Sequence, residues 1–328
     1  MNSTPKISII LPVFNAKKHI EKCIDTLLNQ TLQEIEIIVI LDCPTDRTEQ
    51  IILKYAEKDK RIRVIENTKN LHIGESRNVG IREARGEYIG FSDHDDFRDL
   101  TMYETLYNTA ITNLSDIVFS PCKHISFDEG IVVQHNKPFN FSNCGDLQSY
   151  CLKDLIGNGN NERNESLFIN IQGCIYRNKW IKQHNFSFVD TRAITPEDVL
   201  FQIDTFSKAN KIKIVNDAFY YHVSHSSNEG SKSSYKDIQK RCLGLTYIFN
   251  NINDNSLKES FYINVQKQFL NFLAQTLVPF PNVFKFCYYR RTLREIPFCA
   301  PAFEKKRLIY NKKGIKRLLR NFLYFSLQ

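Results

Sequence analysis

Alternation of apolar runs with segments of helical periodicity constrains the fold of this chain more than any other feature. Near-continuous apolar runs occupy residues 6–14, 35–41, 61–66 and 87–92, and apolar residues at helical spacing fill 19–28, 45–55 and 74–84 between them. Strands that are apolar throughout are typical of parallel sheets buried on both faces. The pattern therefore predicts an α/β fold with a doubly wound, mainly parallel sheet.

The rhythm loosens after residue 100. We expect helices at 103–113 and 177–184, strands at 116–121, 166–173 and 212–215, an irregular polar segment at 123–145, and helices again from about residue 235. This division predicts one domain over residues 1–230, with halves 1–100 and 101–230, followed by a helical region over 231–328. The first half would bind a ligand, because ligands of such sheets lie at the carboxyl ends of the strands.

Three acids follow the fourth apolar run within four positions. The segment Ile89–Asp96 reads IGFSDHDD and places Asp93, Asp95 and Asp96 where a buried strand ends. Such close carboxylates are tolerable around a hard cation such as Mg²⁺ or Mn²⁺, which takes oxygen ligands from carboxylates and substrate phosphates. A solvated loop, or a cap of the helix that follows, is the alternative interpretation.

Polar residues elsewhere are expected at the same edge of the sheet. Asn15 and Asp42 follow the first two strands, and Arg77 lies in the first turns of the third helix. A basic residue beside carboxylates suits a ligand that bears phosphate. Farther along, Glu197 and Asp198 in TPEDVLF either begin a helix or present a carboxylate to a cleft, and the two interpretations are compatible.

Four stretches in this order resemble the family-two inverting nucleotide-sugar glycosyltransferases of the GT-A fold. They are ISIILPVFNAKKHIEKCIDTLLNQT, EIIVILDCPTDRT, NLHIGESRNVGIREARGEYIGFSDHDD and PEDVLF. The resemblance is dense over residues 5–97 and sparse over about 166–225. It implies a GT-A domain of the type that builds bacterial surface glycans.

The resemblance also implies a function for each site residue. Asp42 would bind the base, Arg77 the nucleotide, and Asp93 and Asp95 the ribose and a Mn²⁺ or Mg²⁺ ion. Asp198 would be the catalytic base. The remaining members are Pro12, Val13, Phe14 and Asn15 in the nucleotide pocket, His94 beside the nucleotide-sugar or paired to a neighbouring acid, Asp96 as a third metal ligand, and Glu197 beside the base.

By this resemblance the chain would transfer a single sugar from a nucleotide-sugar to a glycan or a lipid-linked saccharide. The product would be a cell-surface polysaccharide, lipopolysaccharide or capsule. A processive synthase is disfavoured, because no Gln-x-x-Arg-Trp motif and no apolar run long enough to span a membrane occur. A dinucleotide-dependent oxidoreductase is excluded by the lack of a G-x-G-x-x-G motif after the first strand.

The second motif departs from the family pattern, which is close to VDDGSTDGT. Leu41 replaces the first acid, Cys43 and Pro44 replace Gly-Ser, and Arg47 replaces the next glycine. In the family the base is normally uracil, so the resemblance implies a UDP-sugar donor. The departures in the second motif weaken that assignment. They also leave open an alternative function, in which a catalytically degenerate chain binds a nucleotide-sugar or acts as a scaffold in a glycan-assembly complex.

Positive charge is concentrated at the end of the chain. Residues 301–328 carry eight Lys and Arg against Glu304, and the whole chain has a formal charge of +8. Apolar positions 315, 318, 319, 322 and 323 share one helical face, so 302–328 could bind an anionic membrane as a basic amphipathic helix. Packing of that face on the catalytic domain is the alternative.

Nine cysteines without a CxxC pair suggest reduced thiols. We therefore expect a cytoplasmic protein, peripheral on the cytosolic face of the inner membrane, that binds no nucleic acid.

Overall fold

A computed structural model describes residues 4–126, 131–133, 143–153 and 169–224, with single residues between 141 and 155 and between 240 and 250. Contacts divide the chain into two compact units, residues 1–244 and 245–328. The predicted helical region from 231 and its basic tail at 302–328 lie outside the described residues, apart from scattered positions up to Asn250. In the part of the chain that is described, no helix is both long and apolar enough to cross a membrane.

The central sheet has seven strands and is mainly parallel, as the sequence predicted. Its order is β10-β6-β9-β4-β1-β2-β3. The strands are β1 (Ile7–Val13), β2 (Ile35–Leu41), β3 (Ile62–Glu66), β4 (Tyr88–Phe91), β6 (Ile117–Phe119), β9 (Cys174–Arg177) and β10 (Ile212–Ile214). Only β9 among them runs antiparallel, to β4 and β6. Every residue of β1 and β2 is buried, which explains their uninterrupted apolar sequence.

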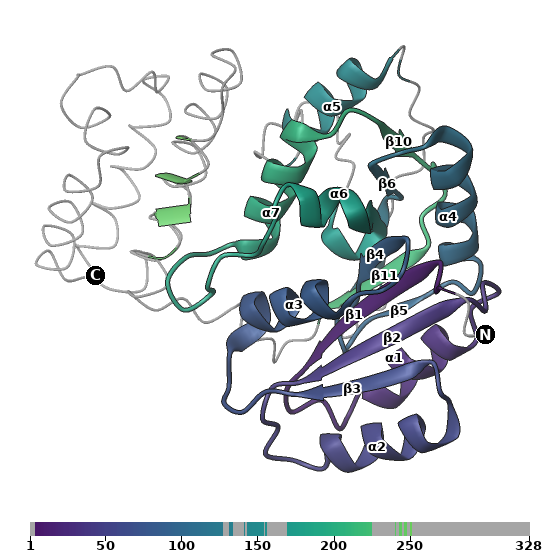
Figure 1. The fold of residues 1–328 in the computed structure, drawn as a ribbon, viewed down its shortest axis with the longest axis vertical. Coiled ribbons are helices and arrows are strands. Elements are labelled where there is room, and N and C mark those ends of the chain that lie inside the picture. The colour runs from purple at the N-terminus through teal and green to yellow at the C-terminus, as the bar shows by residue number, and fades with distance from the viewer. Residues whose placement is uncertain are drawn as a thin grey trace, which may run out of the picture. The chain divides into compact units, whose positions relative to one another are not determined.

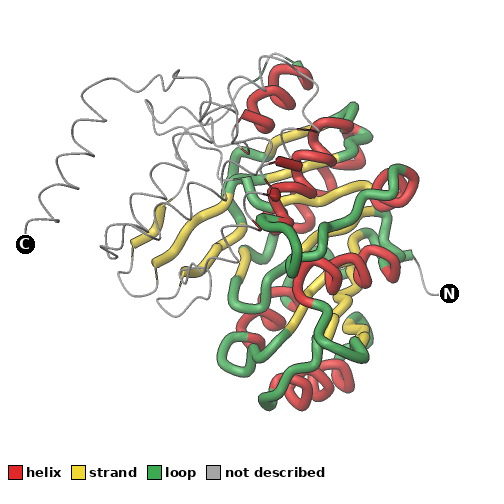
Figure 2. Tube along the Cα trace, turned by 90° about the vertical axis from the view of Figure 1, so that its left-hand side faces the viewer, coloured by secondary structure: helices red, strands yellow, loops and turns green. Residues whose placement is uncertain are grey.

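Helices cover both faces of this sheet (Figure 1). One core packs β1 and β2 against α1 (Ile20–Leu28), α2 (Thr48–Lys58) and α4 (Met102–Asn113). The other packs the opposite face against α3 (His72–Glu83), α5 (Cys144–Lys153), α6 (Asn178–Gln183) and α7 (Glu197–Lys208). In the view of Figure 2 the strands lie between these helices. The fold is an α/β sandwich whose two apolar cores are separated by the sheet.

A second sheet was not predicted. It has the order β5-β11-β7-β8, from β5 (Phe97–Arg98), β7 (Cys122–Ser126), β8 (Ile131–Val133) and β11 (Tyr220–Ser224). The segment expected to be irregular at 123–145 therefore contributes two strands and the start of a helix. Residues 220–224, to which no element was assigned from the sequence, form β11. In this sheet β5, which directly follows the three acids at residues 93–96, pairs with β11 near the end of the predicted domain 1–230.

The strand expected at 166–173 is wrong over residues 169–173, the part of it that the structure describes. Residues 171–173 form a 3₁₀ turn, η2 (Ile171–Gly173), and the strand begins only at Cys174. The Asn170 side chain accepts a hydrogen bond from the Gly173 backbone N–H at 2.8 Å and stabilises the turn. A Cβ at Gly173 would lie 2.6 Å from the Ser120 carbonyl, so the chain passes too close to β6 for a larger residue. Short-range sequence patterns do not carry these tertiary constraints.

A buried carboxylate, Glu36, forms hydrogen bonds that hold the amino ends of neighbouring strands together. Glu36 on β2 is 4% exposed and accepts hydrogen bonds from the Ser8 hydroxyl, the Arg85 backbone N–H and the Arg63 guanidinium. Burial alone would raise the pKa of Glu36, but these three donors together lower it below its ordinary value. The group therefore links three strands and the turn after α3 in its ionised form.

We expect Glu36→Gln to lower the free energy of unfolding by about 2 kcal/mol at pH 7, the order of a charged hydrogen bond. Because the pKa is lowered in the folded state, this stabilisation is present above the unfolded pKa and is lost as pH falls through the folded value. The difference between wild type and variant should therefore shrink below about pH 4. Urea unfolding at several pH values measures it. Glu34→Gln, which removes an exposed pair with Lys6, is the control and should change nothing measurable.

Candidate active site

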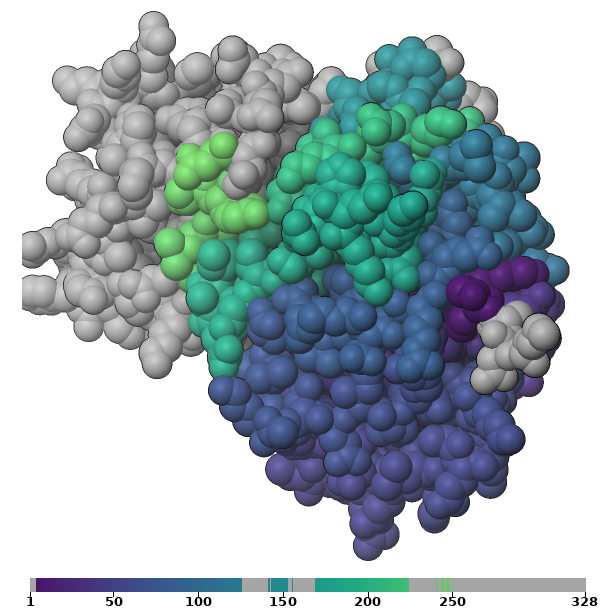
Figure 3. Space-filling model, viewed as in Figure 1, coloured from purple at the N-terminus to yellow at the C-terminus, as the bar shows by residue number. Residues whose placement is uncertain are grey.

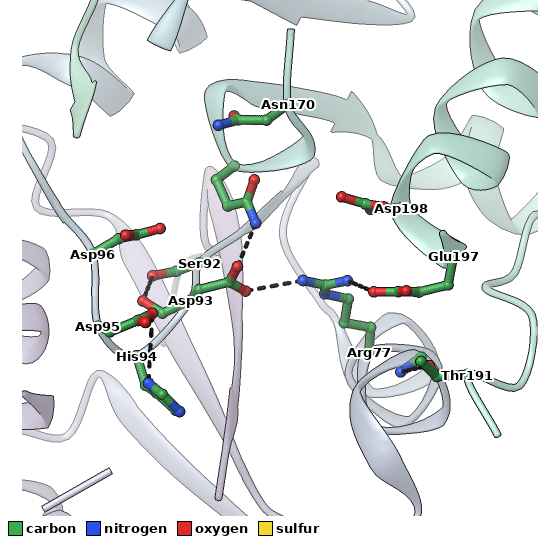
Figure 4. A network of polar contacts seen from close by, with 12 residues as sticks. Arg77, Ser92, Asp93, His94, Asp95, Asp96, Asn170, Thr191, Glu197 and Asp198 are labelled. Atoms are coloured by element: carbon green, nitrogen blue, oxygen red, sulfur yellow. Dashed lines mark hydrogen bonds and ion pairs between the residues drawn. The ribbon is translucent and has the colours of Figure 1, made fainter. Parts of the chain in front are cut away.

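The predicted site residues come from strand ends, from α3 and from the start of α7, and several of them meet in one polar network (Figure 4). Asp93, His94, Asp95 and Asp96 form the loop after β4, which we call the acid loop. Arg77 reaches it from α3, and Glu197 and Asp198 approach from the first turn of α7. Residues from two distant parts of the sequence thus lie within contact distance.

Asp93 is held on both carboxylate oxygens. Oδ1 accepts from Arg77 Nη2 at 2.9 Å, and Oδ2 accepts from Gln172 Nε2 on η2 at 2.6 Å. Its backbone N–H donates to the Tyr220 hydroxyl at 3.3 Å. Burial would raise the pKa of Asp93, but the charge and hydrogen bond of Arg77 lower it below the ordinary value. Asp93 is therefore an ionised group with a fixed orientation.

Asp96 has a different environment from the other two acids. It is 2% exposed, and its oxygens accept from the Tyr220 hydroxyl and the Val223 backbone N–H, both at 2.8 Å. Burial, followed by the charges of Asp93 and Asp95, raises its pKa well above the ordinary value. In this arrangement Asp96 attaches the acid loop to β11. Its predicted function as a third metal ligand stays a prediction.

Asp95 is the acid whose carboxylate is least engaged by protein. Oδ1 lies 3.6 Å from Nδ1 of His94, and the side chain is 23% exposed. Among the described residues no group of three His, Cys, Asp or Glu side chains surrounds one metal position. Mg²⁺ ordinarily takes one or two carboxylates plus substrate phosphates, a requirement that the Asp95 carboxylate alone fits. Both carboxylate oxygens of Asp93 already accept hydrogen bonds from Arg77 and Gln172. The donor set suits a cation shared with a phosphate ligand better than a closed protein cage.

Glu197 and Asp198 differ in how they are bound. Glu197 Oε1 accepts from Arg77 Nη1 at 2.9 Å, while Asp198 Oδ1 accepts only a local bond from the backbone N–H of Val199 at 2.8 Å among the contacts described. Burial and the adjacent Asp198 charge raise the pKa of Glu197, although Arg77 acts in the opposite direction. Figure 4 shows the Asp198 carboxylate directed away from Arg77, on the side of Asn170 and the acid loop. Asp198 is the freer carboxylate of the two.

The predicted base-binding residue, Asp42, is buried at the end of β2. Its carboxylate accepts from Asn67 Nδ2 and the Leu71 backbone N–H at 2.7 Å, and from the His72 backbone N–H at 2.9 Å. Asp42 thereby fixes the loop that leads into α3. Whether it also contacts a base stays a prediction.

The end of β1 carries the other predicted nucleotide residues. Pro12 and Val13 are buried within the strand, whereas Phe14 is 43% exposed just beyond it. The Asn15 side-chain oxygen accepts from the Thr45 backbone N–H at 2.7 Å and joins the ends of β1 and β2. Asn15, Cys43 and His72 all have positive φ, between 48° and 64°. Non-glycine residues in this conformation are often found at functional sites, where surrounding contacts hold them in place.

Three contributors to the site were missed by the sequence analysis: Gln172, Tyr220 and Asn67. Gln172 lies in a 3₁₀ turn that resembles no motif, and Tyr220 is separated from Asp96 by 124 residues. Only the Tyr-Tyr-His-Val run of β11 offered a signal, because its polar aromatic residues sit in a strand-like context.

Comparison with known proteins identifies a family resemblance over most of the described domain. The model of the family described as Glycosyl transferase family 2 matches residues 8–189. An uncharacterized glycosyltransferase, EpsJ, of Bacillus subtilis is 34% identical over 66% of this chain and 61% of its own length. A poly(ribitol-phosphate) beta-glucosyltransferase of Bacillus spizizenii is 29% identical over 81% of this chain and 40% of its own. The chain thus spans less than two thirds of the length of these relatives.

Solved structures show the same fold. S. aureus TarS, residues 1–349, in a complex with UDP-GlcNAc, superposes with a TM-score of 0.65 at 21% identity, covering 89% of this chain and 82% of that one. The complex of the same TarS fragment with UDP gives a TM-score of 0.63 at 20% identity, covering 87% of this chain and 78% of that one. The similarity confirms the predicted GT-A architecture.

Proposed function

Because the chain belongs to glycosyl transferase family 2, we propose that it transfers a single sugar from a nucleotide-sugar, with inversion, to a hydroxyl of a cell-surface glycan or lipid-linked saccharide. The observation that carries this proposal is the meeting of the acid loop with the Glu197–Asp198 pair around Arg77. On one side of the network, the acid loop offers carboxylates for a cation, which in turn would bind a diphosphate. The other side offers a carboxylate, Asp198, suited to accept a proton.

In this proposal Asp198 takes the proton of the acceptor hydroxyl as the oxygen attacks the anomeric carbon. The bond from that carbon to the diphosphate breaks, and attack from the opposite side inverts the configuration. Asp95, with Asp93, would hold a Mn²⁺ or Mg²⁺ ion, and such an ion stabilises negative charge on the leaving diphosphate. Asp93 stays ionised through its contacts with Arg77 and Gln172 and keeps the acid loop in one orientation.

Two observations support a uridine donor and a surface-glycan acceptor. The superposed TarS structures contain UDP and UDP-GlcNAc, and one relative is named for its action on poly(ribitol-phosphate). A screen of nucleotide-sugars by thermal shift, with and without Mn²⁺, followed by donor hydrolysis, tests the proposal. We expect one UDP-sugar to raise the Tm in the presence of metal and to be hydrolysed slowly. Stabilisation by a nucleotide-sugar without turnover in the presence of any saccharide acceptor would instead favour the binding or scaffolding alternative, which Leu41, Cys43 and Pro44 suggested.

Residues 302–328 would bind the protein peripherally to an anionic membrane, which suits a lipid-linked acceptor. The support is the charge pattern, since each base near such a surface contributes about 1 kcal/mol and salt weakens the attraction. We expect full-length protein, but not a truncation at Pro301, to sediment with anionic liposomes at low salt. Neutral liposomes are the control. Equal partitioning of both forms onto anionic vesicles, or none by either, would contradict this proposal.

A further inference from the structure

Helix α3 is one of the elements that join the two halves of the domain. Gly74 lies so close to the segment before α7 that a Cβ would be 2.4 Å from the Val189 carbonyl, and its N–H donates to Thr191 Oγ1 at 3.1 Å. Asn78 exchanges two hydrogen bonds with the backbone of Phe188, at 2.7 and 2.9 Å. Figure 3 shows the α3 surface and this segment side by side. The face of α3 that carries Arg77 is therefore fixed against the approach to α7.

Arg77 is buried between the two carboxylate groups. It is 2% exposed, Nη2 donates to Asp93, and Nη1 donates to Glu197, both at 2.9 Å. The guanidinium carbon also lies 5.3 Å from the centre of the Phe188 ring. Both terminal nitrogens are thus engaged by protein carboxylates. A residue in this position is poorly placed to grip a nucleotide, which was the function that the family resemblance implied.

The guanidinium is planar and its two terminal nitrogens have a fixed separation. The carboxylates that they bind belong to the acid loop, which would hold the donor, and to the residue directly before Asp198. The rigid guanidinium between these carboxylates therefore sets the distance from the donor side of the site to Asp198, the proposed catalytic base. A displacement of about 1 Å in such a geometry can cost about 10²-fold in rate.

We propose that Arg77 is the positioning residue of this site: it couples the acid loop to the start of α7 and so places Asp198 relative to the donor. This inference rests on the proposed glycosyl transfer for its kinetic consequence. The mechanical coupling of the two segments does not depend on that function. The structure supplies a matched control, because Arg63 makes an ion pair of the same kind with the buried Glu36 at the amino end of the sheet, at 2.8 Å.

The experiment compares Arg77→Lys, Arg77→Met and Arg63→Met in the full-length protein. Lys keeps the charge but has a single nitrogen, which cannot span both carboxylates. We expect Arg77→Lys to lower kcat about 10²-fold while KM for the donor changes less than threefold. Arg63→Met should lose stability yet keep kcat at a temperature where it is folded. A tenfold rise in KM at unchanged kcat would show that Arg77 contacts the nucleotide instead.

Hydrogen exchange of the free protein is the readout that needs no activity. In Arg77→Lys, peptides covering residues 92–96 and 194–200 should both exchange at least tenfold faster than in wild type. In Arg63→Met, the exchange rates of these two peptides should change no more than the variant's loss of global stability accounts for. Acceleration in only one segment, or in neither, would overturn the coupling. If no nucleotide-sugar is turned over by wild type, the proposed function fails, and this exchange result still decides the inference.

A double variant separates positioning from loss of stability. Arg77→Met leaves the partly buried Asp93 and Glu197 carboxylates without their cation, so it should be destabilised. Adding Glu197→Gln removes one of these charges and should restore much of the Tm. If Arg77 acts by positioning, kcat of the double variant stays well below that of Glu197→Gln alone. Recovery of kcat together with the Tm would show that Arg77 has a purely structural function.

Discussion

Asp198→Asn should lower turnover by about 10² to 10⁴, the range for the loss of a general base, while the affinity for the donor stays close to that of wild type. The reason is geometric, since Asp198 lies at the start of α7, whereas Asp42 and the predicted pocket residues 12–15 lie at the ends of β2 and β1. Only the step that removes a proton from the acceptor hydroxyl is affected. Donor titration and steady-state kinetics of the same preparation measure the two quantities.

Glu197→Gln is the matched comparison for that result. It alters the neighbouring carboxylate, whose Oε1 is bound by Arg77, and leaves Asp198 in place. We expect it to cost less in turnover than Asp198→Asn, because the amide keeps an oxygen that can accept from Arg77. The reverse ranking would transfer the function of base to Glu197.

Asp95→Asn should abolish metal-dependent transfer, with a loss of more than about 10³-fold, and the protein should remain folded. Asp95 has the least engaged carboxylate of the acid loop, and its removal relieves repulsion from Asp93 and Asp96, so the Tm should not fall. Asp99→Asn is the control, since Asp99 contacts Tyr221 and Lys123 outside the network. Full activity of Asp95→Asn, or of wild type in excess chelator, is incompatible with a divalent cation at this position.

The parts of the fold that sequence predicts well are those in which local pattern and tertiary environment agree. β2 was placed to the residue because each of its side chains is buried, and burial on both faces leaves an unbroken apolar sequence. β5 has only two residues, and β7 reads CKHIS without a regular apolar alternation, so neither strand has a sequence pattern that stands out from its surroundings. Such strands are specified by their partner, β11, and not by their own composition.

The site follows the same division. The acid loop and the Glu197–Asp198 pair were recognisable because their motifs are local. The burial of Arg77 and the engagement of Asp42 were not, because each depends on which groups the folded chain places beside it. A motif indicates that a residue type is required at a position. It does not distinguish a side chain that touches a ligand from one that holds the ligand's neighbours.

The attachment of the acid loop to β11 has a consequence for synthesis of the protein on the ribosome. Asp96 accepts its hydrogen bonds from residues 124 and 127 positions later, so these contacts enclose about half of the unit formed by residues 1–244. Strands β1 to β4 can assemble while the nascent chain is still short, since their neighbours are close in sequence. Asp96 lacks both of these donors until Tyr220 and Val223 have left the exit tunnel. A ribosome-bound chain ending before Tyr220 would contain every motif of the donor half and still leave Asp96 without its contacts to β11.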